Sequence, residues 1–174
     1  MKLIQINKDN YKKTLNKAVI GFVILFAVLS ITFGTILINI FVDTPITGSE
    51  TPNNFRFNLL GVILALLCCA AIVSSIKNKP LFSDLLYVWQ LKQLQNRIYR
   101  RLKKLQKAQK ESNLDALTIL LFYYESLSLV YNLDDNTLTM SSVSKDLAKV
   151  KGDIEQLNVE ISVDDFDVGM VDKF

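Results

Sequence analysis

The residues best placed to do chemistry lie in one apolar stretch, where Glu125 directly follows Tyr123 and Tyr124. A carboxylate or a tyrosine hydroxyl held in apolar surroundings can serve as a general acid or base. Facing a cavity, these three residues would suit a membrane-embedded enzyme or a transport component. The alternative is that Glu125 lies at the solvated rim of a helix, and we favour this alternative.

Other sets of reactive side chains are missing from the sequence. It contains no histidine, which removes the commonest general base and the commonest transition-metal ligand. The two cysteines, Cys68 and Cys69, are adjacent, so they form no disulfide framework and are expected to be small packing residues. The segment 133–139 begins like a calcium loop but lacks the glycine and the later glutamate of such a loop. We therefore expect no cofactor, no metal site and no enzymatic activity.

Two long charge-free runs dominate the first half of the chain. Residues 18–42 and 57–76 are 25 and 20 residues long and contain no charged side chain. About 20 apolar residues in a helix cross a hydrocarbon core roughly 30 Å thick. The first run is too long for a signal peptide and has no cleavage site of small residues. Both runs are predicted to be transmembrane helices.

The basic residues around these runs predict an orientation. Residues 1–17 hold five lysines against one aspartate, and a basic segment follows residue 76. The segment 43–56 between the runs has one arginine and two acidic residues. Because lysine and arginine accumulate on the cytoplasmic side, both termini are predicted to be cytoplasmic and 43–56 a short periplasmic loop. The inner membrane of a cell is the expected location.

Small residues recur on one side of each predicted span, where two membrane helices can approach closely. The expected packing residues are Ala27, Ser30 and Gly34 in the first span, and Gly61, Ala65 and Cys69 in the second. The two sets should meet each other or the same sets in a second copy of the chain.

A basic amphipathic helix is predicted from Leu81 to Lys110, because its apolar residues recur every three or four positions. Residues 77–110 carry a net charge of +9 and residues 111–174 one of −9, so little field remains to attract nucleic acid. The helix is expected to belong to a bundle and to touch anionic lipid headgroups. The headgroup contacts predicted from it are Trp89, Arg97, Arg100, Arg101, Lys104 and Lys107.

Residues 115–133 could form either a third span or the core helix of a small soluble bundle. A charge at the centre of the bilayer costs roughly 2.5 to 3.5 kcal/mol, and Glu125 would lie near that centre. A single polar strip on an otherwise apolar helix favours the soluble bundle. The distribution of lysine and arginine does not decide whether there is a third span. An acidic tail outside the cell would agree equally well with the rule that basic residues stay on the cytoplasmic side.

The sequence as a whole predicts an all-α protein. A two-helix transmembrane hairpin is expected to be followed by a cytosolic helical domain of about three helices over residues 77–174. A heptad seam from Val143 to Leu157 supplies the last of these helices. The acidic tail after it alternates at Val159, Ile161 and Val163, which suggests a short extended piece.

Five segments of the chain resemble a family of short bacterial inner-membrane proteins, domain-of-unknown-function family 3087. They are "MKLIQINKDNYKKTLNKAVIGF", "NFRFNLLGVILALL", "YVWQLKQLQNRIYRRL", "DALTILLFYY" and "LDDNTLT". The resemblance extends over nearly the whole chain. It implies a bacterial inner-membrane location but no activity, cofactor or functional residue.

The function expected from the sequence is therefore that of a multi-pass membrane protein serving as a structural or regulatory subunit through its helical domain. Its partners would be the lipid bilayer and either a second copy or another membrane protein. A membrane-embedded enzyme or transport component using Glu125, and a module that binds anionic lipid at the membrane surface, are the alternatives. No nucleic acid and no identifiable small-molecule substrate are expected.

Overall fold

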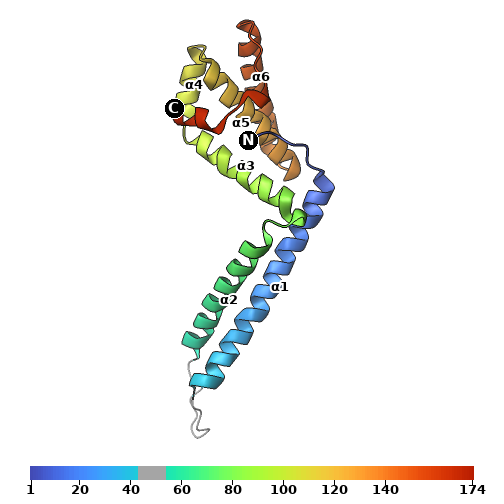
Figure 1. The fold of residues 1–174 in the computed structure, drawn as a ribbon, viewed down its shortest axis with the longest axis vertical. Coiled ribbons are helices and arrows are strands. Elements are labelled where there is room, and N and C mark those ends of the chain that lie inside the picture. Colours follow the sequence, from blue (N-terminus) through green and yellow to red (C-terminus); the bar gives the residue numbers. More distant parts are fainter. Residues whose placement is uncertain (43–53) are drawn as a thin grey trace. The chain divides into compact units, whose positions relative to one another are not determined.

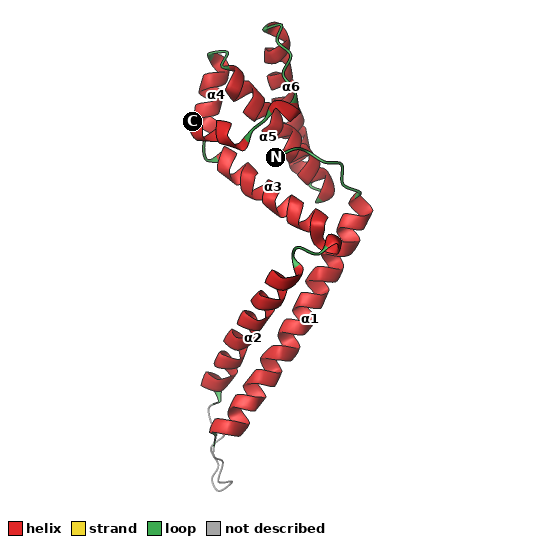
Figure 2. Cartoon of the chain, viewed as in Figure 1, coloured by secondary structure: helices red, strands yellow, loops and turns green. Residues whose placement is uncertain are grey.

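The computed structural model describes residues 1–42 and 54–174, which fold into helices without any strand (Figure 2). This confirms the all-α class for the described residues. The chain forms two compact units. Lys13–Ser83 make up the first, here called the hairpin unit, and Met1–Lys12 with Asp84–Phe174 make up the second, here called the helical domain. Most of the predicted loop at 43–56 lies outside the described residues.

The hairpin unit contains two long apolar helices that run antiparallel (Figure 1). Helix α1 spans Lys8–Phe41, and α2 spans Phe55–Ile76. The first helix begins ten residues before the predicted span, since Asn7 accepts a hydrogen bond from the Asn10 amide at 3.0 Å and so caps its first turn. The second ends before Pro80, which starts the short 3-10 helix η1 (Pro80–Phe82).

The helical domain is built around α5 (Leu114–Leu133), which packs on α4 (Leu102–Lys110) and α6 (Thr137–Gln156). Every side chain from Ala116 to Tyr124 is buried, so both faces of α5 are covered there. In α6, the seam residues Val143, Val150 and Ile154 are buried in the domain. The heptad pattern of α6 is therefore satisfied largely inside one chain.

The predicted single helix from Leu81 to Lys110 is wrong, because it is broken at Arg100 and Arg101 into α3 (Ser83–Tyr99) and α4. At the break, the Arg101 amide donates to the Ile98 carbonyl at 2.9 Å, a tighter bond than that of an α-helix. No proline or glycine marks this position. The break lets Ile98 before it and Leu105 after it both become fully buried. Tertiary packing thus overrides the local helical pattern.

The prediction of an extended piece near the C-terminus is also only partly right. Residues 159–162 are neither helical nor in a strand, but two 3-10 helices follow, η2 (Val163–Asp165) and η3 (Val168–Lys173), and both pack on α5. The apolar residues Phe166 and Val171 are buried there. The acidic tail is thus a folded part of the domain.

Within residues 1–42 and 54–174, three helices are long and apolar enough to cross a membrane: α1, α2 and α5. Their burial within the protein differs sharply. Within the most apolar window of each helix, 6% of the residues are buried for α1, 17% for α2 and 61% for α5. All three helices have the length and the apolar composition of a span, and α5 is the least apolar of them.

Candidate functional site

The basic face of α3 and α4 is the most strongly charged surface predicted from the sequence, and the C-terminal tail covers part of it. The Asp172 carboxylate lies 2.6 Å from the Arg97 guanidinium and 3.3 Å from that of Arg101. The hydrogen bond from Arg97, aided by the charge of both arginines, lowers the pKa of Asp172 below its usual 3.8. Lys104 donates to a C-terminal oxygen of Phe174 at 2.7 Å. Three of the six predicted headgroup contacts are therefore occupied by the tail.

Apolar contacts fix the same tail to the core. The Phe166 ring stacks on Phe122 of α5 with 3.9 Å between the ring centroids, and Val171 is fully buried. Lys173 also pairs with Asp115 at the start of α5, at 2.5 Å. Because burial of large apolar side chains outweighs exposed ion pairs, Phe166 and Val171 hold the tail and the ion pairs set its register.

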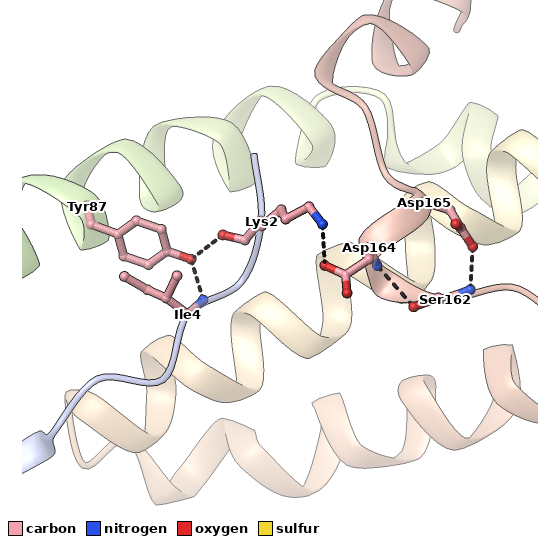
Figure 3. A network of polar contacts seen from close by, with 6 residues as sticks. All are labelled: Lys2, Ile4, Tyr87, Ser162, Asp164 and Asp165. Carbon is pink, nitrogen blue, oxygen red and sulfur yellow. Dashed lines mark hydrogen bonds and ion pairs between the residues drawn. The ribbon is translucent and has the colours of Figure 1, made fainter.

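The N-terminal segment also packs in the helical domain (Figure 3). The Tyr87 hydroxyl donates to the Lys2 carbonyl at 2.8 Å and accepts from the Ile4 amide at 3.2 Å. The Lys2 ammonium lies 3.6 Å from the carboxylate of Asp164, at the η2 turn of the tail. The first residues of the chain are thereby tied to α3 and to the C-terminal tail.

The first turn of α1 adds further contacts within this domain. Tyr11 is buried, and its neighbours Lys8 and Lys12 both form ion pairs with Asp135, at the turn between α5 and α6. Lys92 of α3 pairs with the adjacent Asp134 at 2.7 Å. The sequence predicts only a basic cytoplasmic segment here, although Ile4 and Tyr11 among its lysines are a signal that it packs.

The other predicted headgroup contacts lie on the surface of the domain. Trp89 is 59% exposed, and Arg100 and Lys107 are also exposed. These three come from different turns of α3 and α4 and from the break between them. The structure thus divides the six residues into three held by the tail and three open to solvent.

Glu125 and its neighbouring tyrosines are integrated in the packing of α5. Glu125 pairs with Lys151 of α6 at 2.7 Å, and its side chain is 29% exposed. Tyr123 is buried, which raises its pKa to about 12. One turn away, Gln95 donates to the buried Ser126 hydroxyl at 3.0 Å. These contacts fit a rim carboxylate and a satisfied polar core better than an acid–base site.

A cavity of about 360 Å³ lies beside Tyr124, and Glu125 is not among its lining residues. Its walls come from α4, α5 and α6, and most of its lining side chains are polar or charged. Lys103, Lys107 and Lys110 line it from α4, and Lys149 lines it from α6. The sequence does not predict this cavity. The spacing of the α4 lysines indicates only that they lie on one side of that helix.

In the hairpin unit, small residues lie where α1 and α2 approach. A Cβ atom added to Gly61 would come within 2.5 Å of the Gly34 nitrogen and 3.1 Å of the Ser30 carbonyl oxygen. Ala65 and Cys69 follow on the same side of α2 and are completely buried. Ala27 is exposed and Ser30 is half-buried. Five of the six predicted packing residues therefore lie in or beside this contact, and Ala27 lies outside it.

Several hydroxyl groups of the hairpin form hydrogen bonds within their own helix. The hydroxyls of Ser30 and Thr32 donate to the carbonyls of Phe26 and Val28, four residues earlier, at 2.7 and 2.8 Å. Cys68 is exposed and Cys69 buried, both as free thiols. Across residues 1–42 and 54–174, no group of three or more metal-ligating side chains is close enough to hold an ion.

Comparison with known proteins gives one match. The model of a family described as protein of unknown function (DUF3087) matches residues 1–171. No curated protein and no solved structure matches the chain. The match covers both the hairpin unit and nearly all of the helical domain, in agreement with the resemblance seen in the sequence motifs.

Proposed function

The chain belongs to the DUF3087 family of unknown function, and from its structure we propose that it is a membrane protein that spans the bilayer twice. In this proposal α1 and α2 cross the membrane, and the helical domain lies on one side of it. The domain serves as a structural or regulatory subunit that binds a second copy or another membrane protein.

The observation that carries the proposal is the packing of Met1–Lys12 with Asp84–Phe174 in one compact unit. Tyr11 is buried there, Tyr87 bonds to the backbone of Lys2 and Ile4, and Asp135 pairs with Lys8. Segments packed together occupy the same compartment. The chain between them must then cross the membrane an even number of times, which α1 and α2 satisfy.

The same packing argues against a third span. If α5 crossed the bilayer, the part of the domain before it would be separated from α6 and from the tail. Yet α5 packs on both α4 and α6, and its ends lie beside contacts with both termini of the chain, Lys8 to Asn132 and Lys173 to Asp115. A helix covered in this way has no broad face left for lipid.

The charge distribution then supports a cytoplasmic domain. Residues 1–17 carry five lysines, and the acidic tail no longer offers an alternative orientation because it belongs to the same unit as residues 1–12. Lysine and arginine near a span favour the cytoplasmic side. We therefore place both termini in the cytoplasm of a bacterium, with the hairpin in the inner membrane.

A subunit role is favoured over an enzyme because the candidate acid–base residue is engaged in structure. Glu125 pairs with Lys151 and does not line the cavity. The domain also presents Leu138 at the start of α6 with 91% of its surface exposed. An apolar side chain displayed so fully loses its contact with water when a partner covers it, which favours association.

Photocrosslinking in living cells tests the subunit role. A photoreactive amino acid placed at Leu138 should yield one defined product, identified by mass spectrometry as a second copy or another membrane protein. The same amino acid at the exposed Lys145, two turns along α6, is the matched control and should give none. No product at Leu138, together with the mass of a lone monomer in mild detergent, would rule out the role.

A further inference from the structure

The lysine-lined cavity of the helical domain is formed by residues from three helices that meet around Tyr124. Its volume, about 360 Å³, is within the range of small-molecule sites. Apart from the lysines, the side chains that line it are Gln106, Gln109, Tyr124, Asp146 and Val150. The cavity thus combines a charged rim with hydrogen-bonding groups and one aliphatic side chain.

The four lysines give this cavity its charge. Lys103, Lys107 and Lys110 succeed one another at steps of four and three on α4, and Lys149 faces the same space from α6. Asp146 is the single carboxylate among the lining residues, which leaves a net charge of +3. Like charges gathered around one space repel one another, and an anion placed between them removes that repulsion.

Most other basic residues of the domain are paired, whereas the four cavity lysines, like Arg100 and Lys145, have no partner among the described residues. Arg97 and Arg101 pair with Asp172, and Lys151 pairs with Glu125. In the part of the chain that the structure describes, none of the four ammonium groups forms an ion pair or hydrogen bond. Residues 111–174 contain thirteen acidic side chains, so the missing partners do not reflect a shortage of carboxylates.

The wall of the cavity is preorganised. Tyr124 is buried, which raises the pKa of its hydroxyl, so this group stays protonated at neutral pH and can donate. Gln109 donates to the Asp153 carboxylate at 2.7 Å, which fixes its position on α4. The groups next to the lysines are therefore already held in place by the fold.

We propose that this cavity binds a small ligand that carries phosphate groups with two or more negative charges. Lysine is a common binder of phosphate because its ammonium acts as a compact point charge with three donors. Lys107 of α4 and Lys149 of α6 would hold the ligand from opposite sides. The phosphate could belong to a soluble phosphate ester or to the headgroup of an anionic lipid, since both present the same chemistry. The site is independent of the partner contact at Leu138.

Pyrophosphate is a suitable probe, measured by isothermal titration calorimetry with the full chain in nanodiscs of zwitterionic lipid. We expect saturable binding at one site that weakens as salt is added. The variant Lys107→Gln/Lys149→Gln should weaken binding by about tenfold or more, because it removes two of the four charges. The matched control Lys79→Gln/Lys145→Gln removes two exposed lysines outside the cavity and should change affinity by less than about twofold.

A variant in the opposite direction guards against effects of misfolding. Asp146→Asn removes the single lining carboxylate and should strengthen pyrophosphate binding severalfold. Repeating the titration in nanodiscs of anionic lipid separates the two sources. Loss of pyrophosphate binding there identifies a headgroup as the occupant, and unchanged binding identifies a soluble ligand. Absence of saturable binding in zwitterionic nanodiscs, or equal weakening by the control variant, overturns the proposal.

Discussion

The two helices of the hairpin unit and helix α5 of the helical domain are all long and apolar enough to cross a membrane, but their surroundings differ. Only 17% of the residues in the most apolar window of α2 are buried by protein, against 61% for α5. In α2, the buried residues are the small side chains that face α1, and most large apolar side chains are exposed. Covering by other elements, together with the lower hydropathy of α5, therefore distinguishes a helix suited to lipid from the core helix of a domain.

The polar groups of the two regions differ in the same way. Ser30, Thr32 and Ser75 in the hairpin donate to backbone carbonyls of their own helix, as hydroxyls commonly do where no water is present. In α5, Ser126 accepts a bond from Gln95 of α3, and Glu125 pairs with Lys151 of α6. Polar groups that find their hydrogen-bond partner in their own helix are compatible with a lipid environment. The polar groups of α5 instead need partners from neighbouring helices.

Removing one aromatic ring from each region gives the strongest test of this contrast. Phe122→Ala should destabilise the helical domain by about 3 to 5 kcal/mol, because Phe122 is fully buried and stacks on Phe166. The matched control Phe22→Ala removes a partly exposed ring from α1 and should leave unfolding of the domain unchanged. Chemical denaturation followed by circular dichroism would measure both. Equal effects of the two substitutions would mean that α5 is not a protein core.

A methyl group at the contact between α1 and α2 should have the next largest effect. Gly61→Ala places a carbon within 2.5 Å of the Gly34 nitrogen, which belongs to the backbone and cannot move aside easily. We expect the hairpin to lose about 1 to 3 kcal/mol, as in other overpacked contacts. Gly21→Ala is the control, because a Cβ at Gly21 meets nothing within 4 Å. Energy transfer between dyes on the two helices in nanodiscs would detect the separation, and an unchanged signal for Gly61→Ala would contradict this packing.

A methyl group in α6 should have a smaller effect of opposite sign. Gly152 lies inside this helix, and an added Cβ would meet nothing within 4 Å. Replacing an interior helical glycine by alanine reduces the entropy lost on folding. Gly152→Ala should therefore stabilise the domain by about 0.5 to 1 kcal/mol, seen as a higher midpoint of denaturation. A loss of stability would show that α6 does not have the helical surroundings described.

The smallest effect is expected at the exposed ion pairs of the tail. The pKa of Asp172 is lower in the folded protein than its ordinary value near 3.8. The ion pairs therefore stabilise the folded tail fully above pH 3.8, and this stabilisation is lost as the pH falls through the lowered pKa of the folded state. Asp172→Asn should increase hydrogen exchange in Val168–Phe174 at neutral pH, and acidification should then add less exchange than in the wild type. Exchange that spreads into α5 would instead mean that the ion pairs, rather than Phe166 and Val171, hold the tail.

The helices themselves were accessible from the sequence because each depends on local periodicity. The charge-free runs predict α1 and α2, and the polar strip of α5 favours a core helix over a span. The small-residue spacing around Gly34 and Gly61 also points to the contact that the structure contains. These features repeat within one helix and need no knowledge of distant segments.

The contacts that decide the topology could not be predicted from local sequence periodicity. No local sequence signal predicts the helix break at Arg101. The break results from the burial of Leu105 against the rest of the domain. Phe166 and Val171 are buried although they lie in an acidic, irregular tail, and Tyr11 is buried although it lies among lysines. The cavity requires Lys149 of α6 to meet the lysines of α4. Each of these features joins residues far apart in the chain.

Labelling of single cysteines in intact bacterial cells tests most directly whether both ends of the helical domain lie in one compartment. With Cys68 and Cys69 replaced by alanine, a cysteine would be placed at the exposed Asp9 or at the exposed Ser142 of α6. Our account predicts that a membrane-impermeant maleimide labels neither site in intact cells and labels both in inverted membrane vesicles. Labelling of one site but not the other from the same side would contradict it, because residues 1–12 and 84–174 could not then form one domain.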